Sequence, residues 1–233
     1  MPAPDCLSAW DYTQKNWDDF HREGAACKRQ VRLALQQIQG QQIAADDADD
    51  CAVFILGLRC AYCEAPIRHG GHLEHFRRKN RRRPDGFPER TFDWDNLFLA
   101  CDSTVHCGHY KDRPGADAYN AEDLIKPDIH DPDDYLYFHS TGEVMVRNNR
   151  SNMTELDRRR ASETIRVFNL DCSTLRGERF KVLKLYRDGN LGILEFLMEC
   201  DPADRDAFIR DEVEATRWEP YATTIKHFFE KAA

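Results

Sequence analysis

The sequence predicts an α+β protein that is mainly helical, with a small site-bearing module between two helical segments. Apolar residues recur at helical spacing in the first segment, residues 1–50, and in most of the last segment, residues 132–233. Between them, in residues 51–131, this periodicity is lost, and histidine, cysteine, arginine, glycine and proline accumulate. Such a composition is typical of a module that is built on turns and carries a functional site. We therefore expect three parts with these boundaries.

The first segment predicts two amphipathic helices. Helix-forming residues run from Ser8 to Gln39, with aromatic and aliphatic residues at intervals that suit a buried stripe. Gly24 interrupts this run, and because glycine lowers helix stability we expect one helix on each side of it. The acidic stretch from Asp46 to Asp50 follows, and we expect it to form a solvated turn.

The last segment predicts a β-hairpin followed by helices. Residues 136–147 contain two short alternating runs around Ser140-Thr141-Gly142, which is typical of a hairpin. Start and stop signals then predict four helices. The first spans residues 154–169. The second has Ser173 as its N-cap and ends at about Asp188, and the third has Asp201 as N-cap and Pro202 at N1 and ends at about Trp218. The last follows Pro220.

Composition excludes several classes of protein. With 41% hydrophobic and 32% charged residues, the chain fits a soluble globular protein and neither a disordered nor a fibrous one. The longest apolar stretch, residues 51–58, is far shorter than the roughly 20 residues that cross a bilayer. The first residues lack the basic and apolar regions of a secretory signal, so we expect a cytoplasmic protein with no membrane partner.

Charge is distributed unevenly along the chain. The net charge is −8, which by itself argues against nucleic acid as a partner. Between residues 68 and 90, however, eight basic residues outnumber three acidic ones, which gives this stretch +5 and leaves −13 for the rest. A positive strip on an acidic body can bind phosphate locally without binding polyanions everywhere.

Nine cysteines, an odd number, are not expected to form a disulfide framework in a reducing compartment. Metal binding is then the leading use of closely spaced cysteines, and four of the nine predict a zinc site. Cys60 and Cys63 form a C-x-x-C unit, and Cys101 and Cys107 follow about forty residues later. Two such pairs can close a tetrahedral zinc site, since each lies on a tight turn that points both sulfur atoms inward. The others are expected to be free, small buried residues. These are Cys6, Cys27, Cys51, Cys172 and Cys200.

Two alternatives remain open at this cluster. Cys101 and Cys107 are separated by five residues where two to four are usual, so His106 or His109 could take the fourth ligand position. A C-x-x-C unit also occurs as a redox motif, although no βαβ pattern surrounds this one.

Three short segments of the middle module follow one another in a specific order. HLEHF occupies residues 72–76, DWDNLFLAC residues 93–101 and CGHYKD residues 107–112. Together with the C-x-x-C unit, they resemble the HNH endonuclease family and its ββα-metal fold, which implies a zinc-pinned ββα-metal module between the helical segments. The sequence is most similar to the HNH component of Septu-type and retron-associated anti-phage systems. The later segments DPDDYLYF and TIRVFNLDCSTLRGER extend the likeness over most of the chain.

Hydrolysis of a phosphodiester needs a base for water and a cation that neutralises charge at phosphorus. His75 suits the base, because imidazole titrates near neutral pH. Glu74 and His109 are candidates to hold one divalent cation, Mg²⁺ or Mn²⁺, with positions open for phosphate and water. Adjacent strand residues point to opposite faces, so Glu74 and His75 share a site only if the strand is bent or bulged. The resemblance implies that Asn96 holds the loop that orients His75.

A basic strip follows His75 directly and predicts a clamp on the phosphate backbone of nucleic acid. Contacts of this kind give affinity without base preference, so we expect little sequence specificity. The candidates are Arg77, Arg78, Lys79, Arg81, Arg82, Arg83 and, in addition, Lys111.

These features predict a metal-dependent HNH endonuclease that hydrolyses nucleic acid, with DNA favoured. The resemblance implies a role in anti-phage defence, with an ABC-type ATPase subunit as partner and in some systems a retron reverse transcriptase with its RNA–DNA product. The acidic helical flanks are the expected docking surface for such a partner. Two alternatives remain: a toxin nuclease that acts on RNA such as tRNA, and a zinc-stabilised interaction module without catalysis.

Overall fold

The computed structural model describes residues 2–43, 54–67, 71–148, 150 and 152–232. Within these ranges about half of the chain is helical and the strands form small two-stranded sheets, so the predicted mixture of helix and strand is confirmed. No helix in the same ranges is long and apolar enough to cross a membrane. Three features named by the sequence analysis lie outside the described residues: the acidic turn at 46–50, Cys51 and Arg68.

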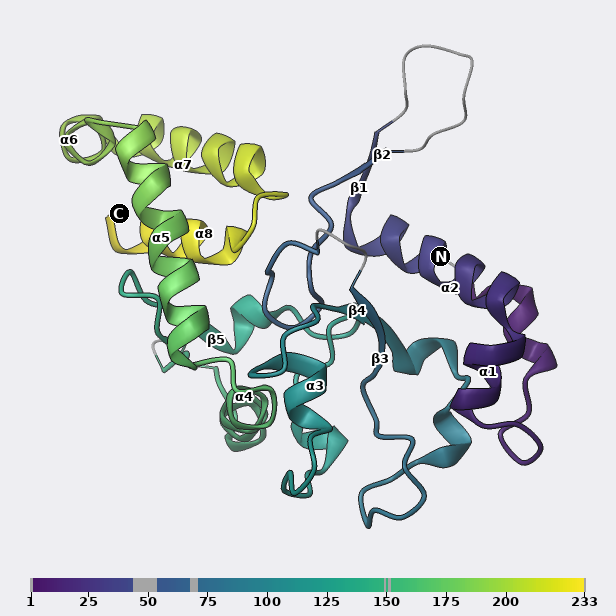
Figure 1. Ribbon diagram of the computed structural model, residues 1–233. Helices are drawn as coiled ribbons and strands as arrows, with labels where there is room; N and C mark the ends of the chain where they lie inside the picture. Colours follow the sequence, from purple (N-terminus) through teal and green to yellow (C-terminus); the bar gives the residue numbers. More distant parts are fainter. Residues whose placement is uncertain (1, 44–53, 68–70, 149, 151, 233) are drawn as a thin grey trace, which may run out of the picture.

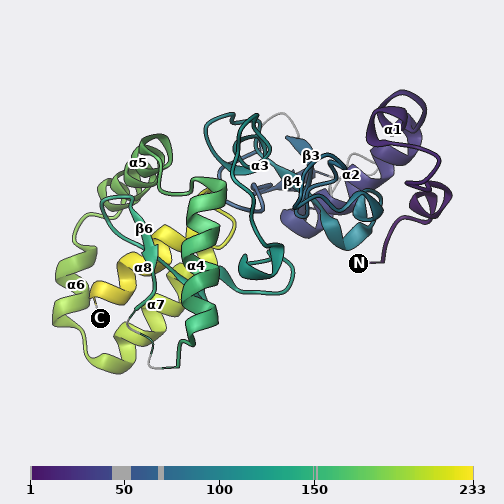
Figure 2. The same ribbon diagram turned by 90° about the horizontal axis from the view of Figure 1, so that it is seen from below.

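The elements form two ends and a middle (Figure 1). α1 (Trp17–Glu23) and α2 (Ala25–Gln39) lie at one end, and the C-terminal helices lie at the other. β3 (His72–His75), β4 (Leu97–Ala100) and the short α3 (Cys107–Lys111) lie between them, as a view from below also shows (Figure 2). The middle part therefore contains the motifs that the sequence singled out.

The first two helices begin and end at local signals. Asn16 caps α1 and forms a capping box with Asp19, whose carboxylate accepts the N–H of Asn16. Gly24 ends α1 and precedes α2, so the predicted interruption is confirmed.

The residues before α1 do not extend it. A 3-10 helix, η1 (Asp5–Ala9), is followed by a turn in which the Asp11 carboxylate accepts the N–H of Thr13. Local bonds of this kind compete with helix formation. The prediction of a helix that begins at Ser8 is therefore wrong for its first residues.

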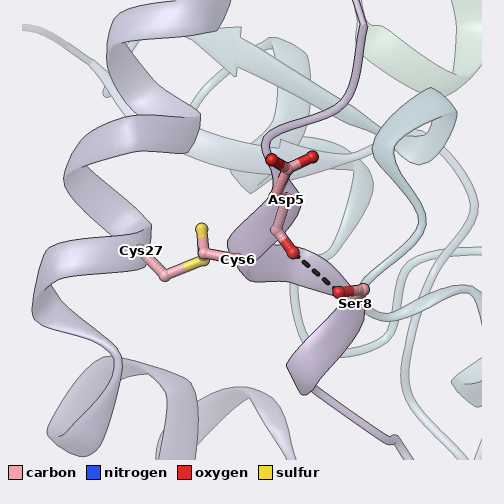
Figure 3. Close-up of a disulfide and its surroundings, with 4 residues drawn as sticks. All are labelled: Asp5, Cys6, Ser8 and Cys27. Carbon is pink, nitrogen blue, oxygen red and sulfur yellow. Dashed lines mark hydrogen bonds between the residues drawn. A yellow bond between two sulfur atoms is a disulfide. The ribbon is translucent and has the colours of Figure 1, made fainter.

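A disulfide joins η1 to α2 (Figure 3). It links Cys6 and Cys27, whose Cα atoms are 5.5 Å apart. The prediction that both thiols are free is wrong, because packing of η1 against α2 brings together two residues that are 21 positions apart. Spacing alone does not reveal such a pairing. Cys172 and Cys200 are free as predicted, but they are only half-buried.

β3 and β4 form an antiparallel hairpin with a regular register. His72 pairs with Ala100 and His75 pairs with Leu97, so each residue of one strand faces one residue of the other. This ladder contains no bulge, and the side chains of β3 alternate between two faces. α3 follows β4, which gives the order strand, strand, helix.

Two further hairpins flank this one in the sequence. β1 (Gln41–Ile43) pairs with β2 (Phe54–Leu56). β5 (Leu136–Phe138) pairs with β6 (Val144–Val146), and the predicted hairpin at this place is confirmed. Gly142 supplies the positive φ of +88° that its turn requires.

Five helices complete the chain. They are α4 (Glu155–Phe168), α5 (Ser173–Gly189), α6 (Ile193–Glu199), α7 (Pro202–Thr216) and α8 (Ala222–Ala232). Asp201 caps α7 ahead of Pro202, as predicted, and Thr154, the first residue of the predicted helix 154–169, is the N-cap of α4. α5 begins one residue earlier than predicted, because Cys172 is its N-cap. α6 was not predicted, since its seven residues are too few to show a helical period.

Two clusters of buried apolar side chains hold these elements together. The larger cluster extends from α1 and α2 through β3 and β4 to α4 and the start of α5, and includes Phe20, Leu97 and Phe168. The smaller cluster joins α5, α6 and α8 through Leu183, Leu197 and other residues. The β3–β4 hairpin is therefore anchored in the larger core.

Candidate functional site

Four sulfur atoms converge in the middle part of the molecule. Sγ of Cys60 lies 3.8 Å from Sγ of Cys107, and Sγ of Cys63 lies 3.9 Å from Sγ of Cys101. All four lie within 4.8 Å of one another. A tetrahedral zinc ion with Zn–S bonds of about 2.3 Å requires S–S distances of about 3.8 Å. The cluster therefore could hold a metal such as zinc.

The acid–base chemistry of these thiols favours a bound cation. Burial raises the pKa of Cys63 and Cys107, whereas hydrogen bonds from Cys107 and Cys60 lower the pKa of Cys101. Four adjacent thiols cannot all ionise without a cation, because their negative charges repel one another. A divalent ion removes this repulsion, and four sulfur donors are a ligand set that structural zinc takes.

Of the two histidines that competed for the fourth ligand position, His106 lies against the cluster and His109 lies elsewhere. Nδ1 of His106 lies 3.2 Å from Sγ of Cys107 and 3.7 Å from Sγ of Cys101, so its ring borders the cluster. A neighbour of this kind supports the ligands from outside. His109 belongs to a different group of side chains.

Left-handed backbone marks the turns that carry the cysteines. Glu64, directly after the C-x-x-C unit, has φ of +61°, and Cys107 at the start of α3 has φ of +60°. Such values are uncommon for residues other than glycine. The Glu64 carboxylate accepts hydrogen bonds from the N–H and the hydroxyl of Thr223. The cluster is thereby connected to the C-terminal helix α8.

The regular strand β3 presents two faces. His75 lies on the side that packs against α1, which we call the Trp17 face. His72 and Glu74 lie on the opposite side together with His109 of α3, which we call the His109 face. The bulge that would bring Glu74 and His75 into one site is absent from this ladder. The expectation that these two neighbours share a site is therefore corrected, because strand alternation separates them.

On the Trp17 face, His75 is buried beneath an aromatic ring. It is 1% exposed, and its ring meets that of Trp17 edge to face at a centroid distance of 4.3 Å. Its Nε2 donates to the carbonyl oxygen of Thr91 at 3.0 Å. Burial, together with the charge of Lys79, lowers the pKa of His75 well below its usual value of 6.5. The ring is therefore neutral at pH 7 and shielded from water.

Asn96 fixes the loop that follows β3. Its Oδ1 accepts the N–H of Arg77 at 2.7 Å, and its Nδ2 donates to the carbonyl oxygens of Arg77 and Arg90 at 3.1 and 2.9 Å. One buried side chain thus holds both ends of the loop 77–90. Thr91, the hydrogen-bond partner of His75, follows this loop directly.

On the His109 face, Glu74 is buried among polar partners. Its Oε2 accepts from Nε2 of His72 at 3.1 Å, and its Oε1 lies 2.8 Å from Nζ of Lys111. Burial raises the pKa of Glu74, but the charge of Lys111 and the hydrogen bond from His72 hold it well below its usual range. Gly108 permits this packing, because a Cβ there would lie 2.3 Å from Oε2. Glu74 is therefore an ionised carboxylate with both oxygen atoms engaged.

Three ligand-type side chains meet at the outer edge of the His109 face. The rings of His72 and His109 stack with centroids 4.0 Å apart, and Nδ1 of His72 lies 3.4 Å from Oδ1 of Asp102. Burial lowers the pKa of His72, but the neighbouring carboxylates of Glu74 and Asp102 raise it overall. Asp102 and His109 are exposed. This face is thus open to water, whereas the Trp17 face is closed.

The sequence analysis missed two members of this group. His72 had a signal, because a residue two positions before Glu74 on a strand shares its face. Asp102 had none beyond its place after Cys101. Of the two predicted ligands of the divalent ion, His109 belongs to this group, whereas Glu74 contacts it only through His72.

The basic strip is partly buried. Four of the predicted nucleic-acid contacts pair with carboxylates, namely Arg77, Arg78, Arg83 and Lys111. Arg78 is 2% exposed and Lys111 is 0% exposed, and both contact Asp112. Carboxylates thus neutralise Arg78 and Lys111 in this structure, and their contact with nucleic acid stays a prediction.

Part of the basic strip lies along a groove of about 580 Å³. The strip residues that line it are Arg78, Lys79, Arg81, Arg82 and Arg83, and the residues around the start of α1 form its other side. Trp17 and Thr91, which both contact His75, also line this groove. The ring of His75 therefore lies one side chain beneath a positively charged groove.

Comparison with known proteins agrees with the order of the motifs. No protein-family model matches the chain. A protein of Escherichia coli that is named a retron Ec83 HNH endonuclease is 28% identical to it, over 84% of this chain and 86% of the relative. This likeness supports the HNH family, whose nucleases are metal-dependent, and it indicates a nuclease role.

Proposed function

We propose that this chain is a metal-dependent endonuclease of the HNH type that hydrolyses phosphodiester bonds of nucleic acid. One observation carries the proposal: four converging sulfur atoms join the C-x-x-C turn to the end of β4 and the start of α3, and the adjoining β3 bears His75 beneath a basic groove and Glu74 with His72 on its other face. The name of the Escherichia coli relative supports the same activity.

Two kinds of metal ion serve this activity in the proposal. The four cysteines would hold zinc, which would tie the C-x-x-C turn to the end of β4 and to α3. Residues of the His109 face would hold a catalytic divalent ion, Mg²⁺ or Mn²⁺. Such an ion supplies charge neutralisation at the phosphate and lowers the pKa of a bound water.

His75 is the proposed base. Because it lies on the opposite face of β3 from the His109 face, it acts with an ion on that face only after Trp17 has left its ring and the end of β3 has been distorted. Its neutral state suits a base, because an unprotonated imidazole nitrogen can accept a proton from water. Nε2 donates to Thr91, which makes Nδ1 the nitrogen with a free lone pair. Nucleic acid that enters the groove meets Trp17 first, so binding there offers a route to displace it.

Lys79, Arg81 and Arg82 bind the nucleic-acid backbone along the groove. Their cationic side chains contact phosphates rather than base edges, so we expect little sequence preference. DNA is the favoured substrate. RNA such as tRNA has the same phosphate charges and is the alternative substrate.

We further propose a role in anti-phage defence, with an ABC-type ATPase subunit and a retron reverse transcriptase with its RNA–DNA product as partners. The relative is named after a retron, which supports this role. Exposed apolar side chains on α5 and α6 suit contact with another protein: Phe180, Leu185, Phe196 and Met198. Co-purification with the products of neighbouring genes tests these partners, and a chain that purifies alone would contradict them.

The activity is tested with plasmid DNA and total RNA in Mg²⁺, in Mn²⁺ and in EDTA, with and without the products of neighbouring genes. We expect cleavage that EDTA abolishes, and we expect His75→Ala to lose it while keeping zinc and fold. No cleavage of either polymer under any of these conditions would favour the non-catalytic zinc-stabilised module.

A further inference from the structure

We propose that His72, Asp102 and His109 bind one first-row transition-metal ion, in a site separate from the four cysteines. Their ligand atoms lie within 4.8 Å of one another. The three residues come from β3, from the segment after β4 and from α3. The inference deepens the proposed function, on which its link to catalysis rests, by naming the residues that hold the divalent ion.

The hydrogen bonding of His72 prepares it as a ligand. Its Nε2 donates to Oε2 of Glu74, which leaves Nδ1 as the nitrogen whose lone pair a metal ion can take in exchange for a proton. Nδ1 is buried, makes no hydrogen bond to any described residue, and lies 3.4 Å from Oδ1 of Asp102. Metal-binding histidines commonly donate their second nitrogen to a carboxylate, which orients the ring. Glu74 occupies this outer position.

Glu74 itself is not a ligand of this ion. Its Oε2 accepts a hydrogen bond from His72, and its Oε1 forms an ion pair with the fully buried ammonium of Lys111. Removing Lys111 from Glu74 would leave a buried cation without its partner, which is costly. The predicted ligand pair of Glu74 and His109 is therefore replaced by His109 with His72 and Asp102.

The ligand set selects among metal ions. Two imidazole nitrogens and one carboxylate suit Mn²⁺, Zn²⁺, Co²⁺ or Ni²⁺, whereas Mg²⁺ prefers oxygen ligands and retained waters. Three protein ligands leave coordination positions open on the exposed side, where 62% of the Asp102 side chain is accessible. Of the two catalytic ions considered, Mn²⁺ is favoured.

The sulfur cluster keeps the site in shape. Asp102 follows Cys101 directly, and His109 lies two residues after Cys107, so a metal on the cysteines fixes both segments. A second group of potential ligands consists of Asp133, His227 and Glu230. Its carboxylates are already paired with Arg147 and Lys226, so they are not free to bind a metal ion.

Metal counting on the full chain tests the site. The protein is dialysed against Mn²⁺, and bound zinc and manganese are counted in the same sample by mass spectrometry. We expect two ions per chain in the wild type. His109→Ala and Asp102→Asn should keep the cysteine-bound zinc and bind Mn²⁺ at least about tenfold more weakly. The matched controls His139→Ala and Asp117→Asn should bind both ions as the wild type does.

The outcomes separate this inference from the proposed function. One ion per wild-type chain, or unchanged Mn²⁺ affinity in both His109→Ala and Asp102→Asn, overturns the site even if the protein cleaves nucleic acid. Two ions per chain, with the second lost in both variants, supports the site even if the wild type cleaves neither DNA nor RNA. In that last case the nuclease proposal fails alone.

Discussion

The two faces of β3 place the same type of side chain in opposite surroundings. His75 is 1% exposed beneath Trp17, whereas the side chain of His72, three positions earlier, is 20% exposed and lies between two carboxylates. Burial lowers the pKa of His75, and Glu74 and Asp102 raise that of His72. One short strand thus presents a shielded neutral imidazole on one side and an imidazole between two carboxylates on the other.

The difference comes from the elements that pack on each face. On the Trp17 face, α1 arrives from the N-terminal segment and covers the strand with an aromatic ring. On the His109 face, α3 lies directly on Glu74 at Gly108, and its exposed side carries His109. Motif order therefore identifies the strand, but the surrounding helices decide which residue water and ions can reach.

Loss of one cysteine should have the largest effect, because both faces depend on the sulfur cluster. We expect Cys60→Ser to lower zinc from about one ion per chain to nearly none. The β3–β4–α3 unit should then unfold, since zinc binding contributes about 10–16 kcal/mol in zinc-finger peptides. Mass spectrometry and near-UV circular dichroism check this, with Cys200→Ser as the matched control. Native dichroism in zinc-free Cys60→Ser would show that neither face needs the cluster.

The next effect tests whether the two faces serve one reaction. His75→Ala should slow cleavage about 100- to 10,000-fold as the loss of a general base. His109→Ala should slow it about 10- to 100-fold through weaker metal binding. Because residues that act in one step are not additive, the double variant should be little slower than His75→Ala alone. Rates of plasmid cleavage at one fixed Mn²⁺ concentration, below the concentration that saturates His109→Ala, measure this.

The control for these variants is a test that each of them still folds. Zinc content and thermal unfolding of each variant are compared with those of His139→Ala, whose side chain lies in the β5–β6 turn. If His75→Ala keeps the fold and cleaves at the wild-type rate, the Trp17 face is structural and the chemistry belongs to the His109 face alone.

The local parts of the site were predictable, and the contacts between distant elements were not. The spacing of the cysteines predicted their convergence, because ligand pairs on tight turns have a known geometry. Strand alternation predicted that Glu74 and His75 diverge unless a bulge intervenes. Burial of His75 could not be predicted, since it depends on Trp17, which is 58 positions earlier in the chain.

The same division holds for the fold. The capping residue Asp201 placed α7 correctly, because its side chain bonds to backbone within the next few residues. The disulfide between Cys6 and Cys27 and the burial of Arg78 depend on packing between separate segments. Neither periodicity nor spacing contains that information.

Two neighbouring parts of the basic strip give a smaller and more local comparison. Arg82→Ala removes an exposed cation from the groove, so we expect weaker DNA binding, a salt slope reduced by about 0.9 and unchanged stability. Arg78→Ala removes a buried partner of Asp85 and Asp112 and should cost about 3 kcal/mol of stability. Fluorescence anisotropy and urea unfolding measure both. Unchanged DNA affinity in Arg82→Ala would place nucleic acid away from the Trp17 face.

The smallest expected effect is the pH dependence that the closed Trp17 face imposes on stability. The folded chain keeps His75 neutral, whereas an unfolded histidine takes up a proton near pH 6.5. Unfolding therefore binds a proton below that pH, and stability should fall with acidification by up to about 1.4 kcal/mol per pH unit from this group. His75→Asn should show a flatter profile between pH 6.5 and 5.5 in urea unfolding. Equal slopes in wild type and variant would mean that Trp17 does not keep protons from the ring.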